Sequence, residues 1–119
     1  QDALIGNRAY DLASLIDDVR FKSNKKLKDR IYNYYAKLNN KKINKVTLLN
    51  DFEILSVLRN MKIIGIFTRL AVRDNKTKYL KLIPYSWKLI ELRIKNNEIF
   101  HNLKSLLDHN FPKKIRNLK

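Results

Sequence analysis

Apolar residues recur at helical spacing in the first part of the chain. They occupy one face at i, i+3, i+4 and i+7, namely Leu12, Leu15, Ile16 and Val19. This pattern predicts an amphipathic helix that opens at Asp11. The neighbouring carboxylates Asp17 and Asp18 point in different directions on a helix, so we expect them to lie on a solvated face.

The next apolar stripe predicts a longer helix with Ser23 as its N-cap. Its apolar positions are Leu27, Ile31, Tyr34, Tyr35 and Leu38. The stripe gives way to the polar stretch 39–45, whose asparagines and lysines predict a loop.

The third segment predicts a central helix. Asn50 followed by Glu53 is a variant of the capping box, placed just before an apolar run. From Phe52 to Val72 the apolar residues cover nearly the whole circumference, which is typical of a buried helix. Gly65 lies inside it and indicates close contact with another helix, with a kink as the alternative. The polar run 73–76 ends the segment.

The last third of the chain predicts a short segment at 77–83 and then two more helices. Pro84 suits the first turn of the earlier one, because its missing N–H needs no partner there. That helix has Trp87, Ile90 and Ile94 on one stripe, and 96–97 indicate a break or a new helix cap. The final helix has a stripe of Ile99, Phe100, Leu103, Leu106 and Leu107, before Pro112 and a basic tail.

These patterns together favour an all-α fold of five or six helices around a central apolar helix. Gly and Pro occur only twice each, and no strand alternation of useful length is present. The 119 residues suffice for one folded unit with a core of its own. The longest charge-free stretch of the most apolar region, 63–68, is far shorter than a membrane span, so we expect no membrane partner.

Composition adds a strong positive charge and excludes cysteine chemistry. The chain has 26 Lys and Arg against 11 Asp and Glu, a formal net charge of +15, and no Cys. Nine basic residues and one acidic residue give 22–45 a net charge of +8, and eleven against three give 76–119 the same value. A basic helical nucleic-acid-binding module is therefore the alternative function. Against it, the aromatic residues fall on apolar stripes and form no stacking array: Tyr34, Tyr35, Phe67 and Trp87.

No complete active site is visible in the residues themselves. His101 and His109 have no carboxylates arranged beside them as a ligand set, and we expect both on the surface. A glycine-rich phosphate loop and a zinc-protease motif are also absent.

Two blocks of sequence carry a resemblance to a known family. Gly6 and Asp11-Leu12-Ala13, with Gln1-Asp2-Ala3 ahead of them, resemble the segment after the metal-binding Asp of the aminoglycoside phosphotransferase and choline kinase superfamily. The second block spans 52–59, 65–70, 73–74 and 79–80. It is similar to the branch of bacterial kinases that phosphorylate N-acetylmuramate and N-acetylglucosamine at the anomeric hydroxyl.

The resemblance implies that 1–119 is a single partial domain, the helical C-terminal part of a protein-kinase-like phosphotransferase lobe. The parent enzyme would use ATP and Mg to phosphorylate a sugar or amino-sugar hydroxyl, in the cytoplasm and in peptidoglycan recycling. The family's catalytic loop and magnesium-binding Asp would lie before Gln1. We therefore expect no catalytic or metal-binding residue in this chain, no ATP or Mg bound by it alone, no activity of it alone, and no specific nucleic-acid partner. Oligomeric state stays open.

The resemblance also implies roles for five residues. Asp11 matches an Asp that supports the catalytic loop through hydrogen bonds to its backbone, and the alternative is that Asp11 caps its helix. The candidates for the substrate pocket are Arg69, Arg73, Asp74 and Tyr79. An arginine there could pair with an acceptor carboxylate such as the lactyl group of a muramic acid. Alternatively, Arg69 and Arg73 are structural partners of Asp74 or of a helix C-terminus.

Overall fold

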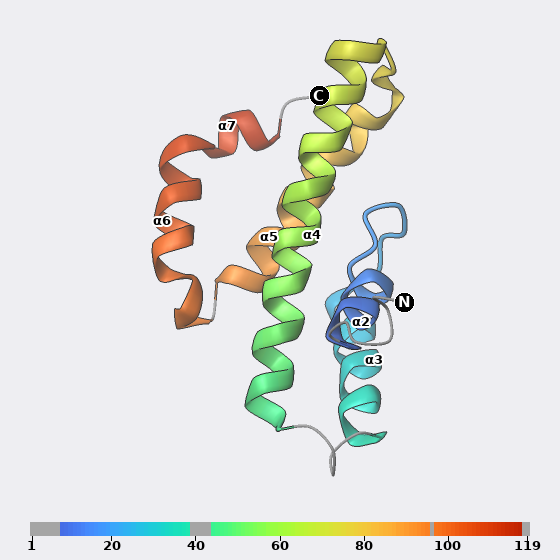
Figure 1. Ribbon diagram of the computed structural model, residues 1–119, viewed down its shortest axis with the longest axis vertical. Helices are drawn as coiled ribbons and strands as arrows, with labels where there is room; N and C mark the ends of the chain where they lie inside the picture. Colours follow the sequence, from blue (N-terminus) through green and yellow to red (C-terminus); the bar gives the residue numbers. More distant parts are fainter. Residues whose placement is uncertain (1–7, 39–43, 96, 118–119) are drawn as a thin grey trace. The chain divides into compact units, whose positions relative to one another are not determined.

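The computed structural model describes residues 8–38, 44–95 and 97–117, and these residues form helices joined by short connections (Figure 1). Within these ranges there are six α-helices and no strand, which confirms the expected all-α class. The chain divides into two compact units, Gln1–Ser56 and Val57–Lys119. The single partial domain expected over 1–119 stays a prediction.

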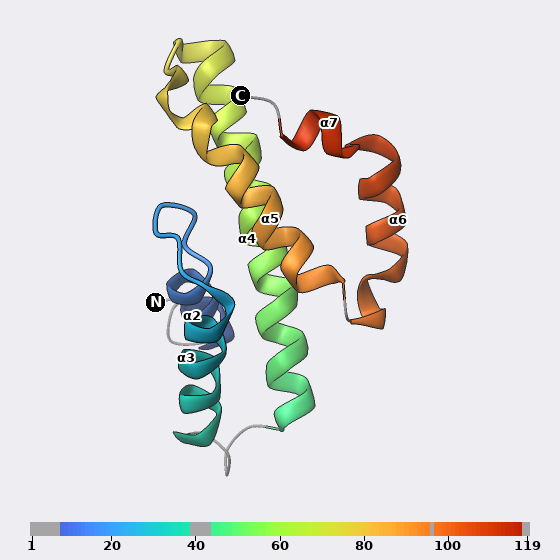
Figure 2. The same cartoon turned by 180° about the vertical axis from the view of Figure 1, so that it is seen from behind.

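The unit Gln1–Ser56 contains α2 (Arg8–Ile16), α3 (Lys25–Leu38) and the first part of α4 (Lys45–Asp74). Helices α2 and α3 lie side by side in both views (Figures 1 and 2). The core of this unit comes from α2 and α4: Ala9, Leu12, Ala13, Ile16, Leu48 and Phe52. The ring of Tyr32, on α3, packs against Phe52 with the ring centroids 5.0 Å apart.

The boundaries and buried face of α2 differ from the expected ones. The helix is already formed at Arg8, so Asp11 lies in its first turn and does not cap it. It ends at Ile16, and Val19 is buried from a position beyond the helix. Leu15 is exposed although it falls on the apolar stripe. The helix is short, and its small residues Ala9 and Ala13 take positions in the core.

Helix α3 is rotated relative to the expected stripe. Its N-cap is Asn24 and not Ser23, because the Leu27 amide donates to Asn24 Oδ1 at 2.8 Å. Tyr34 and Leu38 are each 66% exposed, while Ile31, Tyr32, Tyr35 and Ala36 pack on the core. The buried face of α3 also includes Lys28. A pattern of apolar positions does not indicate a buried lysine.

Helix α4 begins earlier than the capping-box pattern predicts. Asn44 accepts hydrogen bonds from the amides of Val46 and Thr47, at 2.9 and 3.2 Å, so the expected cap at Asn50 is wrong. The expected end is confirmed: the helix stops at Asp74, and Asn75 adopts a left-handed conformation with a φ of 56°.

The expectation of an entirely buried α4 is wrong as well. Phe52, Val57 and the polar residues Ser56 and Asn60 are buried, but Val72 is 80% exposed. The apolar residues that cover the circumference of this helix are therefore not all in a core.

The unit Val57–Lys119 contains the rest of α4 followed by η1 (Thr77–Leu82), α5 (Ile83–Ile94), η2 (Glu98–Phe100), α6 (His101–Asn110) and α7 (Lys113–Arg116). Its core consists of Val57, Trp87, Ile90, Ile94, Phe100 and Leu107. The stripe expected on α5 is thus confirmed, as is Pro84 in its first turn. In the last stripe Ile99 and Leu106 are exposed, contrary to expectation.

Two further features complete the secondary structure. Asn97 caps η2 by accepting a hydrogen bond from the Ile99 amide, and the other residue of the expected break, 96, lies outside the described residues. A search of the described helices for one with the length and hydropathy of a membrane span finds none.

Candidate functional site

Asp11 is exposed on α2. The family resemblance gives this residue the role of supporting a catalytic loop. The block 1–6 that carries the first part of the resemblance lies outside the described residues. The carboxylate of Asp11 is thus accessible to a partner, and its role toward a catalytic loop stays a prediction.

Arg73 and Asp74 form an ion pair with each other at the end of α4. The Arg73 Nε and Nη2 atoms donate to Asp74 Oδ1 and Oδ2, each at 3.1 Å, in a fork geometry. Both side chains are substantially exposed, so this pair adds little to stability. The pairing agrees with the alternative that gave Arg73 a structural partner.

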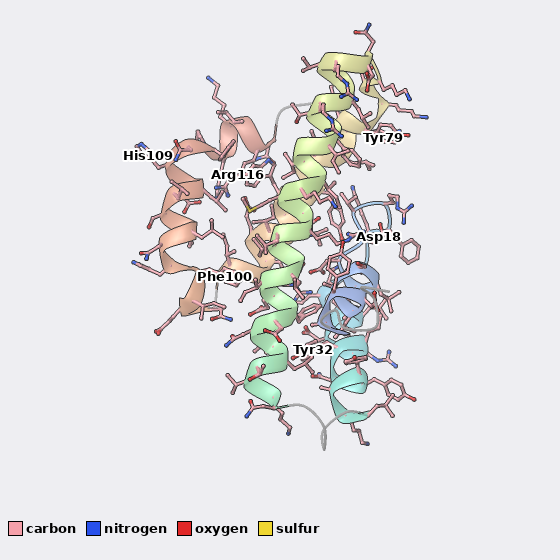
Figure 3. The ribbon with its side chains drawn as sticks, viewed as in Figure 1. Asp18, Tyr32, Tyr79, Phe100, His109 and Arg116 are labelled. Atoms are coloured by element: carbon pink, nitrogen blue, oxygen red, sulfur yellow. The ribbon has the colours of Figure 1, made fainter. Side chains whose placement is uncertain are left out.

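Tyr79 lies on η1 and stacks on α4 (Figure 3). Its ring is 5.2 Å from that of Phe67 with an interplanar angle of 18°, and Lys78 Nζ lies 5.1 Å from the Tyr79 centroid. Arg69 is two residues from Phe67, and successive helix residues are about 100° apart, so the two point to different faces. The four pocket candidates therefore do not converge on one point.

Arg69 instead lines an apolar groove of about 530 Å³ within the Val57–Lys119 unit. Ile64 and Gly65 of α4 line it too, opposite Trp87, Leu107 and Phe111. We call it the Gly65 groove. Apart from its two chain neighbours and the nearby backbone of α4, no atom lies within 4 Å of the position that a Cβ on Gly65 would take, and α4 runs from Lys45 to Asp74 without interruption. The expected close contact with another helix is therefore wrong, and the alternative of a kink stays a prediction.

Arg116, on α7, contacts α5 and α6 of this unit, a role that the sequence did not reveal (Figure 3). Its guanidinium is buried and donates to Glu91 at 2.8 Å, to Asp108 at 2.9 Å and to the carbonyl of Phe111. It also lies 4.8 Å from the centroid of the Trp87 ring. One residue of the basic tail thereby fastens α7 to α5 and α6.

Hydrogen bonds with Lys104 and Arg116, the first being the larger effect, lower the pKa of Asp108 below its ordinary value. Lys104 Nζ lies 2.8 Å from Asp108 Oδ2, one helical turn away on α6. Asp108 thus joins an exposed pair to the buried Arg116.

Asp17 is fully buried, contrary to its expected place on a solvated face. Ser56 Oγ donates to Asp17 Oδ2, and Lys28 Nζ lies 3.3 Å from Asp17 Oδ1. The same Nζ donates to the carbonyl of Ile16 at 2.7 Å, at the end of α2. The network joins α2, α3 and α4 within the Gln1–Ser56 unit. Its neighbour Asp18 pairs with Arg20 on the surface, which raises the pKa of Arg20.

The remaining candidates lie on the surface. His101 and His109 are exposed, as expected, and the described residues contain no group of three His, Cys, Asp or Glu side chains that could hold a metal ion. Tyr34, expected on a core stripe, shares the outer face of α3 with the exposed cations Lys26, Arg30 and Lys37. One argument against the nucleic-acid alternative therefore weakens.

Two curated proteins match most of the chain. The N-acetylmuramate/N-acetylglucosamine kinase of Caulobacter vibrioides is 28% identical over 92 residues, which are 77% of this chain and 25% of that protein. The protein of the same name from Neisseria meningitidis serogroup B is 35% identical over 89 residues, 71% of this chain and 27% of that protein. The chain spans about a quarter of the length of these relatives. No protein-family model matches the chain, and no solved structure matches it.

Proposed function

We propose that this chain is the C-terminal helical part of an ATP-dependent phosphotransferase that acts on a sugar or amino-sugar hydroxyl. The observation that carries the proposal is the match over about three quarters of the chain to two proteins named N-acetylmuramate/N-acetylglucosamine kinase. The motif blocks around Asp11 and along 52–80 support it, since they resemble the same branch of kinases.

Within this proposal, the described residues form a scaffold, and residues elsewhere in the enzyme carry out phosphoryl transfer. Phosphoryl transfer depends on magnesium and on cations placed around the phosphates. We propose that the ATP and magnesium sites of the enzyme are formed by other residues.

Within this proposal, Arg73 is the candidate for contact with the acceptor. Its guanidinium is exposed and oriented by Asp74, and a planar guanidinium recognises a carboxylate through two parallel hydrogen bonds. N-acetylmuramate carries a lactyl carboxylate that N-acetylglucosamine lacks. Arg73 would therefore distinguish the two sugars.

The test compares the 119-residue chain with the protein encoded by its complete reading frame. We expect the complete protein to transfer phosphate from ATP to N-acetylmuramate or N-acetylglucosamine, and the chain alone to transfer none. In the complete protein, Arg73→Gln should raise KM for N-acetylmuramate about tenfold, since hydrogen bonds to charged groups contribute about 1.5–3 kcal/mol, and leave KM for N-acetylglucosamine unchanged.

Two results would contradict the proposal. One is phosphate transfer by the purified chain alone. The other is a complete reading frame without the Ile-Asp-Phe/Trp and His-x-Asp-x-x-x-x-Asn motifs ahead of Gln1, because both belong to the family that the chain resembles. An equal rise of KM for both sugars would remove only the assignment of Arg73.

A further inference from the structure

The Gly65 groove has the size and composition of a small-molecule site. Its volume of about 530 Å³ falls within the range of roughly 300–1,000 Å³ that is typical of ligand pockets. Most of its lining is apolar, with Ile64 on α4 facing Leu107 and the aromatic rings of Trp87 and Phe111. All of these residues belong to the Val57–Lys119 unit.

Gly65 keeps the floor of this groove open. A glycine inside a helix weakens the helix relative to alanine, so its presence calls for a reason. Packing against another helix is not that reason, because a Cβ at this position would meet no atom within 4 Å beyond its chain neighbours and the nearby backbone of α4. The bare backbone instead leaves room in the groove beside Arg69, one helical turn further along α4.

Contacts within the chain hold the aromatic wall opposite. The rings of Trp87 and Phe111 are 5.2 Å apart with an interplanar angle of 39°. Arg116 lies over Trp87 and also donates to the carbonyl of Phe111, so one buried guanidinium contacts both parts of the wall. Such a wall can bind a ligand without first being ordered, which favours affinity.

The polar groups of the groove select the charge of its occupant. Arg69 lines it and makes no hydrogen bond or ion pair with the part of the chain that the structure describes. The hydroxyl of Thr68, which also lines it, already donates to the carbonyl of Ile64 at 2.8 Å. A sugar would bring several hydroxyl groups that find no partner here, and unpartnered buried polar groups oppose binding.

We propose that the Gly65 groove binds a small monocarboxylate with an apolar body, such as an alkyl chain of medium length. The body packs on Trp87 and Phe111 over the open backbone of Gly65, and the carboxylate pairs with Arg69. This proposal does not depend on the kinase function, because it rests on the lining of the groove and on Arg69.

Trp87 makes the proposal directly measurable, because it is the only tryptophan in the sequence and it lines the groove. Decanoate, kept below its micelle concentration, is the probe, and decanol is its uncharged match. Titration of the 119-residue chain with decanoate should give a saturable change in Trp87 fluorescence. Decanol and N-acetylmuramate should bind at least about tenfold more weakly, since the first lacks the charge and the second the apolar body.

Substitutions then locate the site. Gly65→Leu places a side chain on the floor and should raise the dissociation constant for decanoate at least about tenfold. Arg69→Gln should have a similar effect, whereas Lys81→Gln removes the same charge outside the groove and should have none. Leu106→Ala, which removes an exposed leucine elsewhere on α6, should leave binding unchanged. Circular dichroism of each variant establishes that it is folded.

Several outcomes would overturn the proposal. These are equal binding of decanoate and decanol, equal losses in Arg69→Gln and Lys81→Gln, or unchanged binding in a folded Gly65→Leu variant. Sedimentation of the chain tests a second copy as the occupant. If Gly65→Leu abolishes self-association and decanoate leaves Trp87 unaffected, the groove is an interface between copies and not a ligand site.

Discussion

At the scale of single residues, Asp17 is a buried carboxylate that contacts two other helices of its unit. Its carboxylate is 0% exposed, and its oxygens face a hydroxyl from Ser56 and an ammonium from Lys28. A buried ion pair of this kind is weak support for stability in itself, because desolvation opposes the attraction. Removing one partner is different, since it leaves the other charge buried without compensation.

We expect Asp17→Asn to lower the free energy of unfolding by about 3–5 kcal/mol, the range for breaking a buried pair. The double variant Asp17→Asn/Lys28→Met should be less destabilised than the sum of its two single variants, because it leaves no buried charge. Urea unfolding of the four proteins measures this coupling. Lys25→Met, which breaks the exposed Lys25–Asp29 pair, is the control and should cost less than about 1 kcal/mol. Strict additivity of the two single variants would contradict a coupled pair.

At the scale of elements, a helix starts where a side chain accepts hydrogen bonds from the amides of its first turn. More than one asparagine near the start of α4 has a side chain of the right type for this. The sequence favours Asn50 because Glu53 follows it, but the structure places the cap of α4 at Asn44. The capping-box pattern fails there since the helix already runs through Asn50. The same ambiguity moved the start of α3 from Ser23 to Asn24.

Replacing the observed cap tests this assignment. Asn44→Ala should lower the free energy of unfolding by about 1 kcal/mol, because two amides of the first turn of α4 lose their acceptor. Asn33→Ala, at an exposed position inside α3, is the matched control and should be neutral or slightly stabilising, since alanine has the higher helix propensity. Thermal unfolding followed by circular dichroism distinguishes the two. A larger effect at Asn33 than at Asn44 would refute the cap.

The helical pattern therefore predicted which segments are helices, but not which polar residues are buried. Stripes such as Trp87, Ile90 and Ile94 are local and confirmed. Asp17 and Ser56 are 39 residues apart, so no local pattern indicates that they meet. The candidate site also depends on contacts between distant segments. A motif pointed to Arg69, but the groove that it lines is formed together with residues of α5 and α6, which no local pattern indicates.

At the scale of the whole molecule, the excess of positive charge makes each carboxylate important at low pH. With a net charge of +15 at neutral pH, every protonated carboxylate adds to self-repulsion in the compact state. The pKa of Asp108 is lowered in the folded chain, so its contribution to stability is present above the pKa of an unfolded Asp. That contribution is lost as the pH falls through the lower, folded pKa.

Acid should therefore weaken the contacts of Arg116 that join α7 to α5 and α6. We expect the free energy of unfolding of the chain to fall as the pH decreases below about 4, near the pKa of an unperturbed Asp. Asp108→Asn should be less stable than the parent at neutral pH, and it should lose less stability on acidification. Urea midpoints measured across this range provide the test. Glu98→Gln, which removes a carboxylate that forms no ion pair within the described part of the chain, should change the slope less than Asp108→Asn does. Identical slopes for Asp108→Asn and the parent would contradict the role of this carboxylate.

The burial of Lys28 also gives the chain an internal marker of unfolding. Every other lysine in the described ranges is exposed, and Lys28 is 3% exposed. An amine-acylating reagent would thus modify the surface lysines of the native protein and spare Lys28, because acylation requires the amine to meet the reagent. The fraction of molecules acylated at Lys28, measured by mass spectrometry over time, would report how often the Gln1–Ser56 unit opens.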